Sequence, residues 1–294
     1  MLHVAATRLG LRQMSSPSFS IDDVRLITIH LDRAAYQQAG ADQKAYFQHL
    51  LRGLEQNEWV TRGGKPVKEM MFIDLEALES FEDYIAQCRK IHKGNAIRDA
   101  NKAARTGYYT KFFNSQNHLD DILAISLSSP ERQGHRLSDH YFLTAEEQGG
   151  YPASIEAEPT LNGALAWYRY FGLFQRKPGH RQGHLPVDEE LLAYGLLRRC
   201  GEFALITKFI GHAEHLRNGI MYKMHVDMID TLLKQRDLAR AGDETADRSL
   251  RGLRYLTNTR YFGQPAGLVQ WKVRMLYRPG FFQYDFDLGA LPAS

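Results

Sequence analysis

The sequence predicts a mixed α+β fold in which a central, mostly antiparallel, twisted sheet is flanked by helices. Short runs of β-branched and aromatic residues alternate along the chain with longer segments whose apolar residues recur at helical spacing. The two longest extended runs are separated only by a tight turn, which indicates a β-hairpin. With 294 residues, 44% of them hydrophobic, the chain can fill the core of one large domain or of two ordinary ones.

The first half of the chain is predicted to open with a strand, a helix and further short strands. The helix covers "DQKAYFQHLLRGLEQN", where Tyr46, Leu50 and Leu54 lie at helical spacing. A glycine–proline turn, "RGGKP", separates two short extended pieces that follow it. The other expected elements are a first strand at 24–31, extended pieces at 58–61 and 68–75, a helix at 95–105, a tyrosine-rich strand from residue 108, a helix at 118–126 and a polar loop at 129–141.

The second half has a more regular order. "ELLAYGLLRRCGEFALITKFIGH" predicts two long strands joined by a turn at 200–202. After "GHAEHLRNGIMYKMH", a helix is expected from about Asn218 to Arg236, since Met221, Met224, Met228 and other apolar residues fall near one face. The remaining expected elements are a strand at 163–175, an exposed loop at 177–186, a strand at 253–259, a helix at 266–276 and a last strand at 281–288.

Composition excludes several classes of function. A formal net charge of +3 is far from the concentrated charge of a nucleic-acid coat protein, so any basic site must be local. Cys88 and Cys200 form no CxxC pair and are expected to be buried thiols of a reducing compartment. No apolar run approaches the ~20 residues of a membrane span. Serine-hydrolase, Walker, Rossmann and kinase motifs are not found, and residues 1–20 are expected to be a flexible leader.

The order hairpin, glycine turn, helix, strand, helix, strand resembles the GNAT superfamily of N-acyltransferases. The resemblance rests on "LLAYGLLRRCGEFALITKFIGH", "LRNGIMYKMHVDMI", "LRYLTNT" and "GLVQWKVRMLYRP" and covers about residues 160–288. It implies that the strand before the glycine turn and the strand after the helix splay apart, with an acyl donor in the gap. The ending is similar to the "GL..fK...GF.P" pattern of GNAT-like proteins at Gly267, Leu268, Trp271, Lys272, Tyr277 and Pro279.

The N-terminal half also mixes strands and helices, with an Arg-x-Gly loop at 132–134, and is similar to Fem-type and leucyl/phenylalanyl-transferase-like proteins. That resemblance implies two tandem GNAT-like units, at 21–156 and 157–294, in a bacterial cytoplasmic transferase. It implies acyl-CoA or aminoacyl-tRNA as donor co-substrate and no metal. "RNGIMY" has one glycine followed by the bulky Ile220 and Met221, whereas close approach of main-chain amides to phosphate normally needs small residues. This departure favours a donor other than ordinary acetyl-CoA.

Roles at the donor site follow from the expected gap. We expect main-chain groups at the end of the strand to contact the developing oxyanion, and the helix start to bind a donor phosphate through its amides, although a plain capped helix start is the simpler reading. His212 is the candidate proton acceptor, and Tyr222 or Tyr277 the candidate proton donor to the leaving group. The donor-binding residues are Ile210, Gly211, Arg217, Asn218, Gly219 and Ile220.

Basic and aromatic residues suggest where a substrate binds. Arg98 and Lys102 lie on one face of the helix at 95–105, which is either a solvated basic face or a site for a phosphate-rich ligand such as a tRNA acceptor end. The polar loop at 129–141 is either a hydrogen-bonded surface loop or an acceptor-recognition segment. The substrate-binding candidates are Arg98, Lys102, Arg132, His135, Tyr141 and Trp167.

Three histidines in the glycine-turn region raise the question of a metal. His212 and His215 are three apart and His225 lies ten further on, but no fourth ligand has characteristic spacing, so the prediction is no metal. His225 falls on the Met221/Met228 stripe and is expected in the core.

Two functions remain open from the sequence. The leading hypothesis is transfer of an acyl or aminoacyl group to a small-molecule, sugar or peptide amine, with tRNA as a partner if the donor is an aminoacyl-tRNA. The alternative is a catalytically silent GNAT-like module that binds RNA, a polysaccharide precursor or a protein. The sequence leaves open whether the two halves share one sheet, and what the oligomeric state is.

Overall fold

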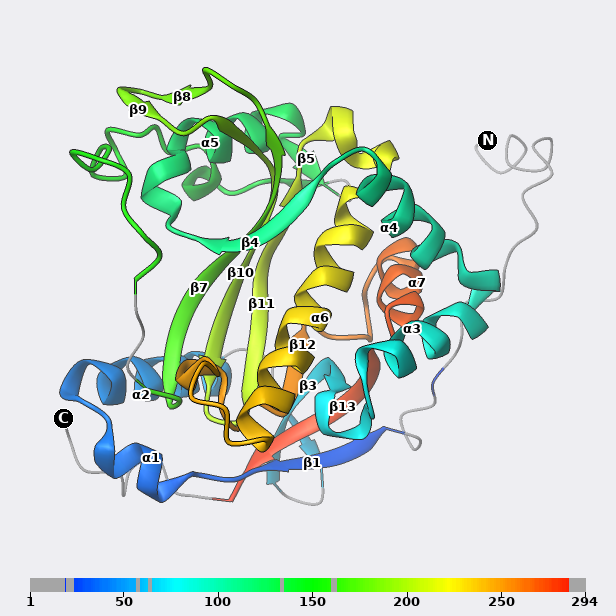
Figure 1. Cartoon of the computed structure of the whole chain (residues 1–294). Helices are drawn as coiled ribbons and strands as arrows, with labels where there is room; N and C mark the ends of the chain where they lie inside the picture. The colour runs from blue at the N-terminus through cyan, green and yellow to red at the C-terminus, as the bar shows by residue number, and fades with distance from the viewer. Residues whose placement is uncertain are drawn as a thin grey trace, which may run out of the picture.

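A single large sheet dominates the computed structural model, which describes Phe19 and residues 24–285 apart from 57–58, 63–64, 133–134 and 160–162 (Figure 1). Its strands follow the order β1-β13-β3-β12-β11-β10-β7-β4, and β2 pairs with β3. Among the described strands of this sheet, only the β1–β13 and β11–β12 pairings are parallel, so the predicted, mostly antiparallel sheet is confirmed. The strands are β1 (Arg25–Ile29), β2 (Trp59–Arg62), β3 (Lys65–Asp74), β4 (Tyr109–Phe113), β7 (Ala166–Arg176), β10 (Glu189–Cys200), β11 (Phe203–Gly211), β12 (Tyr255–Asn258) and β13 (Arg278–Tyr284).

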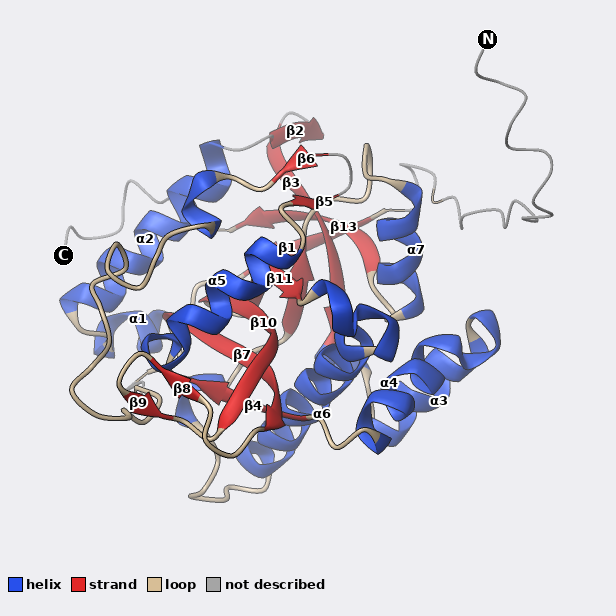
Figure 2. Ribbon diagram, turned by 90° about the horizontal axis from the view of Figure 1, so that it is seen from above, coloured by secondary structure: helices blue, strands red, loops and turns tan. Residues whose placement is uncertain are grey.

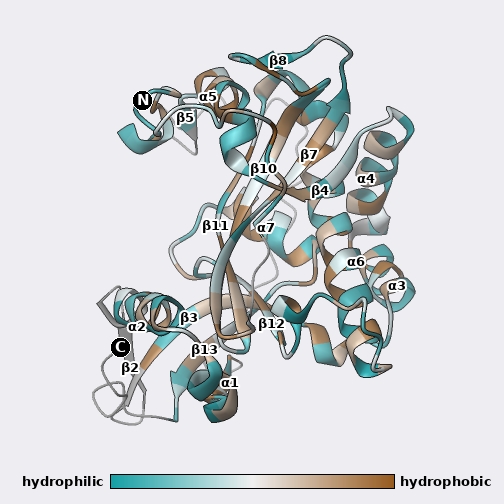
Figure 3. Ribbon diagram, turned by 60° about the vertical axis from the view of Figure 1, so that its left-hand side comes forward, coloured by the Kyte–Doolittle hydropathy of each residue, from teal (hydrophilic) through white to brown (hydrophobic). Residues whose placement is uncertain are grey.

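Helices cover both faces of this sheet. Seen from the side and from above, α3, α4 and α6 lie over one face, and α1, α2 and α5 over the other (Figures 2 and 3). Three buried clusters match this layering, since one lies under α3, α4 and α6, one under α2 and one under α5. The helices are α1 (Arg33–Gln38), α2 (Ala41–Gln56), α3 (Phe81–Lys90), α4 (Asn95–Arg105), α5 (Leu119–Ser128), α6 (Ile220–Arg240) and α7 (Ala266–Arg274).

Strands from both halves of the chain are interleaved in the sheet. β3 lies between β12 and β13, while β1 pairs with β13 and β4 with β7. The sequence left open whether the two halves share one sheet, and the structure shows that they do. The division at 156/157 into two GNAT-like units stays an expectation.

The predicted hairpin is present as β10 and β11. Cys200 pairs with Phe203, and the turn between them contains Gly201 at φ 60°, a left-handed conformation that suits glycine. β10 is buried along nearly its whole length because helices cover it on both faces, which explains why its sequence is a continuous apolar run.

β11 and β12 are parallel neighbours for only a short distance. Their paired residues are 203–205 of β11 and 255–257 of β12. β11 continues to Gly211, and a 3₁₀ turn (Ala213–Asn218) then leads into α6. The GNAT-like order that the sequence predicts, hairpin, helix, parallel strand, helix, strand, is thus present, and the two strands separate where the resemblance implies a gap.

Several elements differ from the prediction. α3 is not anticipated, although Ser80 caps it by accepting a hydrogen bond from Asp83 N and acidic residues occupy its first turn. The helix expected from Asn218 begins at Ile220, because Gly219 at φ 81° breaks the backbone direction there, and it ends at Arg240. The loops at 129–141 and 177–186 contain two-residue strand pairs: β5 (Glu131–Arg132) with β6 (His135–Arg136), and β8 (Arg181–Gln182) with β9 (Leu185–Pro186).

The predictions about membranes and the leader have separate outcomes. Among the described residues, no helix combines the length and apolarity needed to cross a bilayer. Of the predicted leader at 1–20, only Phe19 is within the described part. Cys88 and Cys200 are both buried free thiols, as predicted.

Candidate functional site

Aromatic side chains line the place where β11 and β12 separate. The ring of Phe209 on β11 lies 5.4 Å from that of Trp271 on α7, and Tyr222 on α6 lies 6.3 Å from Trp271. All three side chains are half-buried. The separated part of β11 therefore faces an apolar, partly accessible wall made by α6 and α7.

Behind this wall, His225 and Tyr277 form a buried pair. His225 is 0% exposed, its Nε2 lies 2.9 Å from the Tyr277 hydroxyl, and its Nδ1 lies 3.4 Å from the Tyr84 hydroxyl. Burial lowers the pKa of His225 to about 3, so the ring is neutral. His225 is in the core, as predicted. Tyr277, a candidate proton donor, is 1% exposed, and burial raises its pKa.

The start of α6 is held against α4. A Cβ on Gly219 would meet the carbonyl of Asp99, so only glycine lets the two helices approach this closely. α4 contributes to the approach by burying a face made largely of alanines. Lys102 Nζ donates to the Arg217 carbonyl over 2.9 Å. The structure therefore places Lys102, a predicted substrate-binding residue, beside Arg217, a predicted donor-binding residue.

The other donor-site candidates lie along the same segment. Ile210 is buried in the cluster under α5, and Gly211 packs against Met221 and Ile220. Asn218 Nδ2 donates to the Tyr108 hydroxyl over 3.3 Å. Arg217 is exposed, so its guanidinium is accessible to a ligand.

The substrate-binding candidates do not gather at one place. Arg98 is exposed on α4 and donates to Asn95 Oδ1. Trp167 is 3% exposed on the α6 side of the sheet, and its indole N–H donates to the Ser249 carbonyl over 2.8 Å. Tyr141 lies on the α5 side, where Lys208 Nζ is 5.0 Å from its ring centroid. The side chains of Arg132 and His135 lie outside the described residues.

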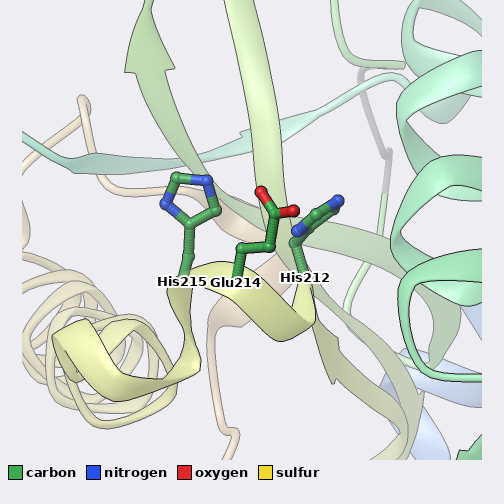
Figure 4. Close-up of side chains that lie close together, drawn as sticks. All are labelled: His212, Glu214 and His215. Atoms are coloured by element: carbon green, nitrogen blue, oxygen red, sulfur yellow. The ribbon is translucent and has the colours of Figure 1, made fainter.

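At the end of β11, three side chains of metal-ligand type come together. One nitrogen or oxygen of each of His212, Glu214 and His215 lies within 4.8 Å of the others (Figure 4). The His212 amide still donates to Leu192 O of β10, and the His215 Nδ1 lies 3.0 Å from the Tyr108 hydroxyl. Sequence reasoning paired the two histidines with His225 and missed Glu214, although the spacing H-x-E-H was the available signal.

A partly buried ionic network under α5 was also missed. Glu189 lies 2.6 Å from Lys111 Nζ and 3.4 Å from His118 Nε2, and it accepts a hydrogen bond from the Tyr109 hydroxyl. Burial alone would raise the pKa of Glu189, but the bonds from His118, Lys111 and Tyr109 outweigh it and lower that pKa to about 2. Burial alone would lower the pKa of His118, and its bonds to Asp121 and Glu189 instead raise it.

Lys272, singled out by the resemblance, ties down the chain after β12. It is 0% exposed, and its Nζ donates to Thr259 O over 3.0 Å, to Thr259 Oγ1 over 2.8 Å and to Arg260 O over 3.2 Å. Burial lowers its pKa to about 8. Lys272 therefore fixes the loop on the β12 side of the gap.

Comparisons with known proteins give structural similarities only. Neither a protein-family model nor a curated protein matches the sequence. Over 72% of this chain, the structure is similar to FemX, with 10% sequence identity and a TM-score of 0.44. Over 72% it is also similar to a crystal structure named as the C-terminal domain (DUF2156) of a lysylphosphatidylglycerol synthetase from Agrobacterium fabrum, with 14% identity and a TM-score of 0.38.

A third similar structure is a tandem GNAT protein from the clavulanic acid biosynthesis pathway, matched over 75% of this chain with 10% identity and a TM-score of 0.34. The matched part covers 59% of FemX, 58% of the synthetase domain and 52% of the tandem GNAT protein. The chain thus spans between half and three fifths of the length of these three proteins.

Proposed function

We propose that the protein transfers an acyl or aminoacyl group from an activated donor to an amine, with the donor held where β11 and β12 separate. The observation that supports this most is the short pairing of the two strands, 203–205 with 255–257, followed by the separate course of β11 to Gly211. A strand edge without a neighbour offers main-chain N–H groups. Such donors, fixed in place, suit the oxyanion that develops on a thioester or ester carbonyl.

The phosphate-bearing part of the donor binds at the start of α6. The first amides of a helix have no partner within it, and the helix dipole favours an anion there. Lys102 from α4 and the exposed Arg217 add two positive charges beside these amides. Both acyl-CoA and aminoacyl-tRNA carry phosphates, so this arrangement supports either donor.

The reaction needs little side-chain chemistry because the donor is already activated. The amine nitrogen attacks the donor carbonyl, the C–S or C–O bond to the carrier breaks, and Tyr222 returns a proton to the leaving sulfur or oxygen. We choose Tyr222 over Tyr277 because Tyr222 is half-buried at the gap, whereas the Tyr277 hydroxyl lies in the core beside His225.

The amine proton passes to water at the open edge of β11. His212 was the expected acceptor, but its ring lies 5.6 Å from that of His215, whose Nδ1 is beside Tyr108. His212 therefore belongs to a cluster with Glu214 and His215 in the turn that follows β11. We assign the acceptor to the class of small-molecule, sugar or peptide amines.

Calorimetric titration with acetyl-CoA, longer acyl-CoAs and aminoacyl-tRNA tests this function, followed by mass spectrometry of products with a panel of primary amines. We expect one donor class to bind and to yield an amide. Lys102→Ala and Arg217→Ala each remove one charged contact, which corresponds to roughly 10-fold weaker binding. Arg181→Ala, an exposed arginine on β8, is the control and leaves binding unchanged.

Two outcomes contradict the proposal. One is that no donor binds, or that binding is indifferent to Lys102 and Arg217. The other is salt-sensitive binding of RNA with no amide product, which supports the alternative of an RNA-binding module.

A further inference from the structure

The turn that follows β11 carries two histidines and a glutamate that are not needed for acyl transfer. His212, Glu214 and His215 come from four consecutive residues, and their ligand-type atoms lie within 4.8 Å of one another (Figure 4). In a tetrahedral zinc site with bonds near 2.0 Å, neighbouring ligand atoms are ~3.4 Å apart. The separations here, at most 4.8 Å, exceed that spacing by no more than ~1.4 Å.

Neither histidine is fully engaged by the protein. Nδ1 of His212 is buried and has no hydrogen-bond partner among the described residues. A buried imidazole nitrogen without a partner costs free energy, and coordination of a cation would recover it. His215 uses Nδ1 for Tyr108, which leaves Nε2 for a ligand.

Tyr108 and Asn218 orient the His215 ring. Asn218 Nδ2 donates to the Tyr108 oxygen over 3.3 Å, and that oxygen lies 3.0 Å from His215 Nδ1. When Nδ1–H donates to Tyr108, the lone pair is on Nε2, the tautomer that binds metal. Metal-ligating histidines usually donate their other N–H to such a neighbour.

The second group of metal-ligand type in the described structure differs in this respect. Asp121, His180 and Glu190 also lie close together. There, Asp121 binds His180 Nε2 over 2.9 Å and accepts from the Leu191 amide, and Glu190 pairs with Lys177 over 2.7 Å. The side chains of that group are already hydrogen-bonded or ion-paired within the protein, so they are not free to bind a metal ion.

We propose that His212, Glu214 and His215 bind one divalent transition metal ion of the zinc type through two imidazole nitrogens and one carboxylate. Such a set suits Zn²⁺ and Co²⁺ and leaves a coordination position for water or a ligand. Through His215, the ion connects the turn after β11 to Tyr108, the residue before β4. This inference goes beyond the proposed acyl transfer and does not depend on it.

The test uses the full chain without an affinity tag, stripped with a chelator and dialysed. Titration with Co²⁺ is followed by visible absorption, and titration with Zn²⁺ by calorimetry. We expect one equivalent of metal, with the absorption of four- or five-coordinate Co²⁺. Glu214→Gln, His212→Ala and His215→Ala weaken binding by on the order of 100-fold, and Tyr108→Phe by roughly 10-fold, because loss of an orienting neighbour costs less than loss of a ligand.

Glu214 is exposed, so Glu214→Gln keeps the fold and remains informative if a histidine variant fails to fold. His140→Ala and Glu146→Gln, exposed residues outside the cluster, are the matched controls and leave binding unchanged. Absence of one-to-one binding, or binding that Glu214→Gln leaves intact, overturns the proposal. Acyl transfer that persists in Glu214→Gln does not bear on it, so the two proposals fail separately.

Discussion

Glu189 shows at the scale of one residue how a half-buried charge depends on its neighbours. It lies between His118 and Lys111 and accepts a hydrogen bond from Tyr109. Its pKa of about 2 is below the ordinary 4.5 of a glutamate, so the folded chain holds the carboxylate ionised where the unfolded chain would protonate it. This contribution to stability is fully present above pH ~5 and is lost as the pH falls toward about 2.

Glu189→Gln is predicted to lower the free energy of unfolding at pH 7 by roughly 1–3 kcal/mol, since His118 and Lys111 lose their shared charged partner. The difference from the wild type shrinks between pH 5 and pH 2, where the wild-type carboxylate gains its proton. Urea unfolding at several pH values measures this. Glu146→Gln, an exposed glutamate, is the control, and a difference that stays constant down to pH 2 contradicts the assigned role.

Lys272 gives a second residue-scale prediction, in which stability again rises with pH, but in the alkaline range. Its pKa is about 8 in the folded protein and near 10.5 when exposed, so between these values the unfolded chain binds the proton more tightly. Stability should therefore rise with pH through that interval as a result of Lys272. In Lys272→Met this component is absent. The difference in unfolding free energy between wild type and variant, measured at pH 7.5 and pH 9.5, tests it, and a pH-independent difference contradicts it.

The contact of α4 with α6 is the element-scale feature that fixes the proposed donor site. It depends on Gly219, which adopts φ 81° and lies against the carbonyl of Asp99. Gly242, after the end of α6, has φ 72° and open space around it. Both glycines have a left-handed conformation, but a side chain would fit only at Gly242.

Gly219→Ala is therefore predicted to destabilise the protein more than Gly242→Ala. The left-handed backbone costs about 1–2 kcal/mol at either position. At Gly219, the forced separation of α4 and α6 adds about 1–3 kcal/mol. Thermal unfolding of the two variants measures this, and equal losses would show that the close approach is not needed.

The sequence predicts helices and strands better than it predicts tertiary contacts between distant residues. The helix at 95–105 and the hairpin turn at 200–202 are predicted to within a residue because periodicity and turn chemistry are local. α3 is missed although a serine and two acids mark its start. The cluster around Glu189 joins residues far apart in sequence, so no periodicity reveals it. The cluster around Glu214 lies on an irregular turn, and its only sequence signal is the H-x-E-H spacing. Trp167 was proposed for substrate from its type alone, and its burial follows from tertiary packing.

At the scale of the whole molecule, the interleaved sheet couples the two halves of the chain. β3 separates β12 from β13, and β4 extends the sheet beside β7. Within the large sheet, the strands of each half also pair with strands of the other half, so removing either half leaves open strand edges within the core.

We therefore predict one cooperative unfolding transition for residues 21–294. Near- and far-ultraviolet circular dichroism should give the same midpoint in urea. A fragment of residues 157–294 alone should lack a cooperative transition, because β12 and β13 lose the strand between them. Two separated transitions in the full chain, or a stably folded fragment, would favour two independent units divided at 156/157.

Hydrogen–deuterium exchange with and without a bound acyl donor decides whether the donor lies between β11 and β12. We expect protection confined to the β11 amides of residues 206–211 and to the first turn of α6. Protection at the α2 or α5 side of the sheet, with none along β11, would contradict it.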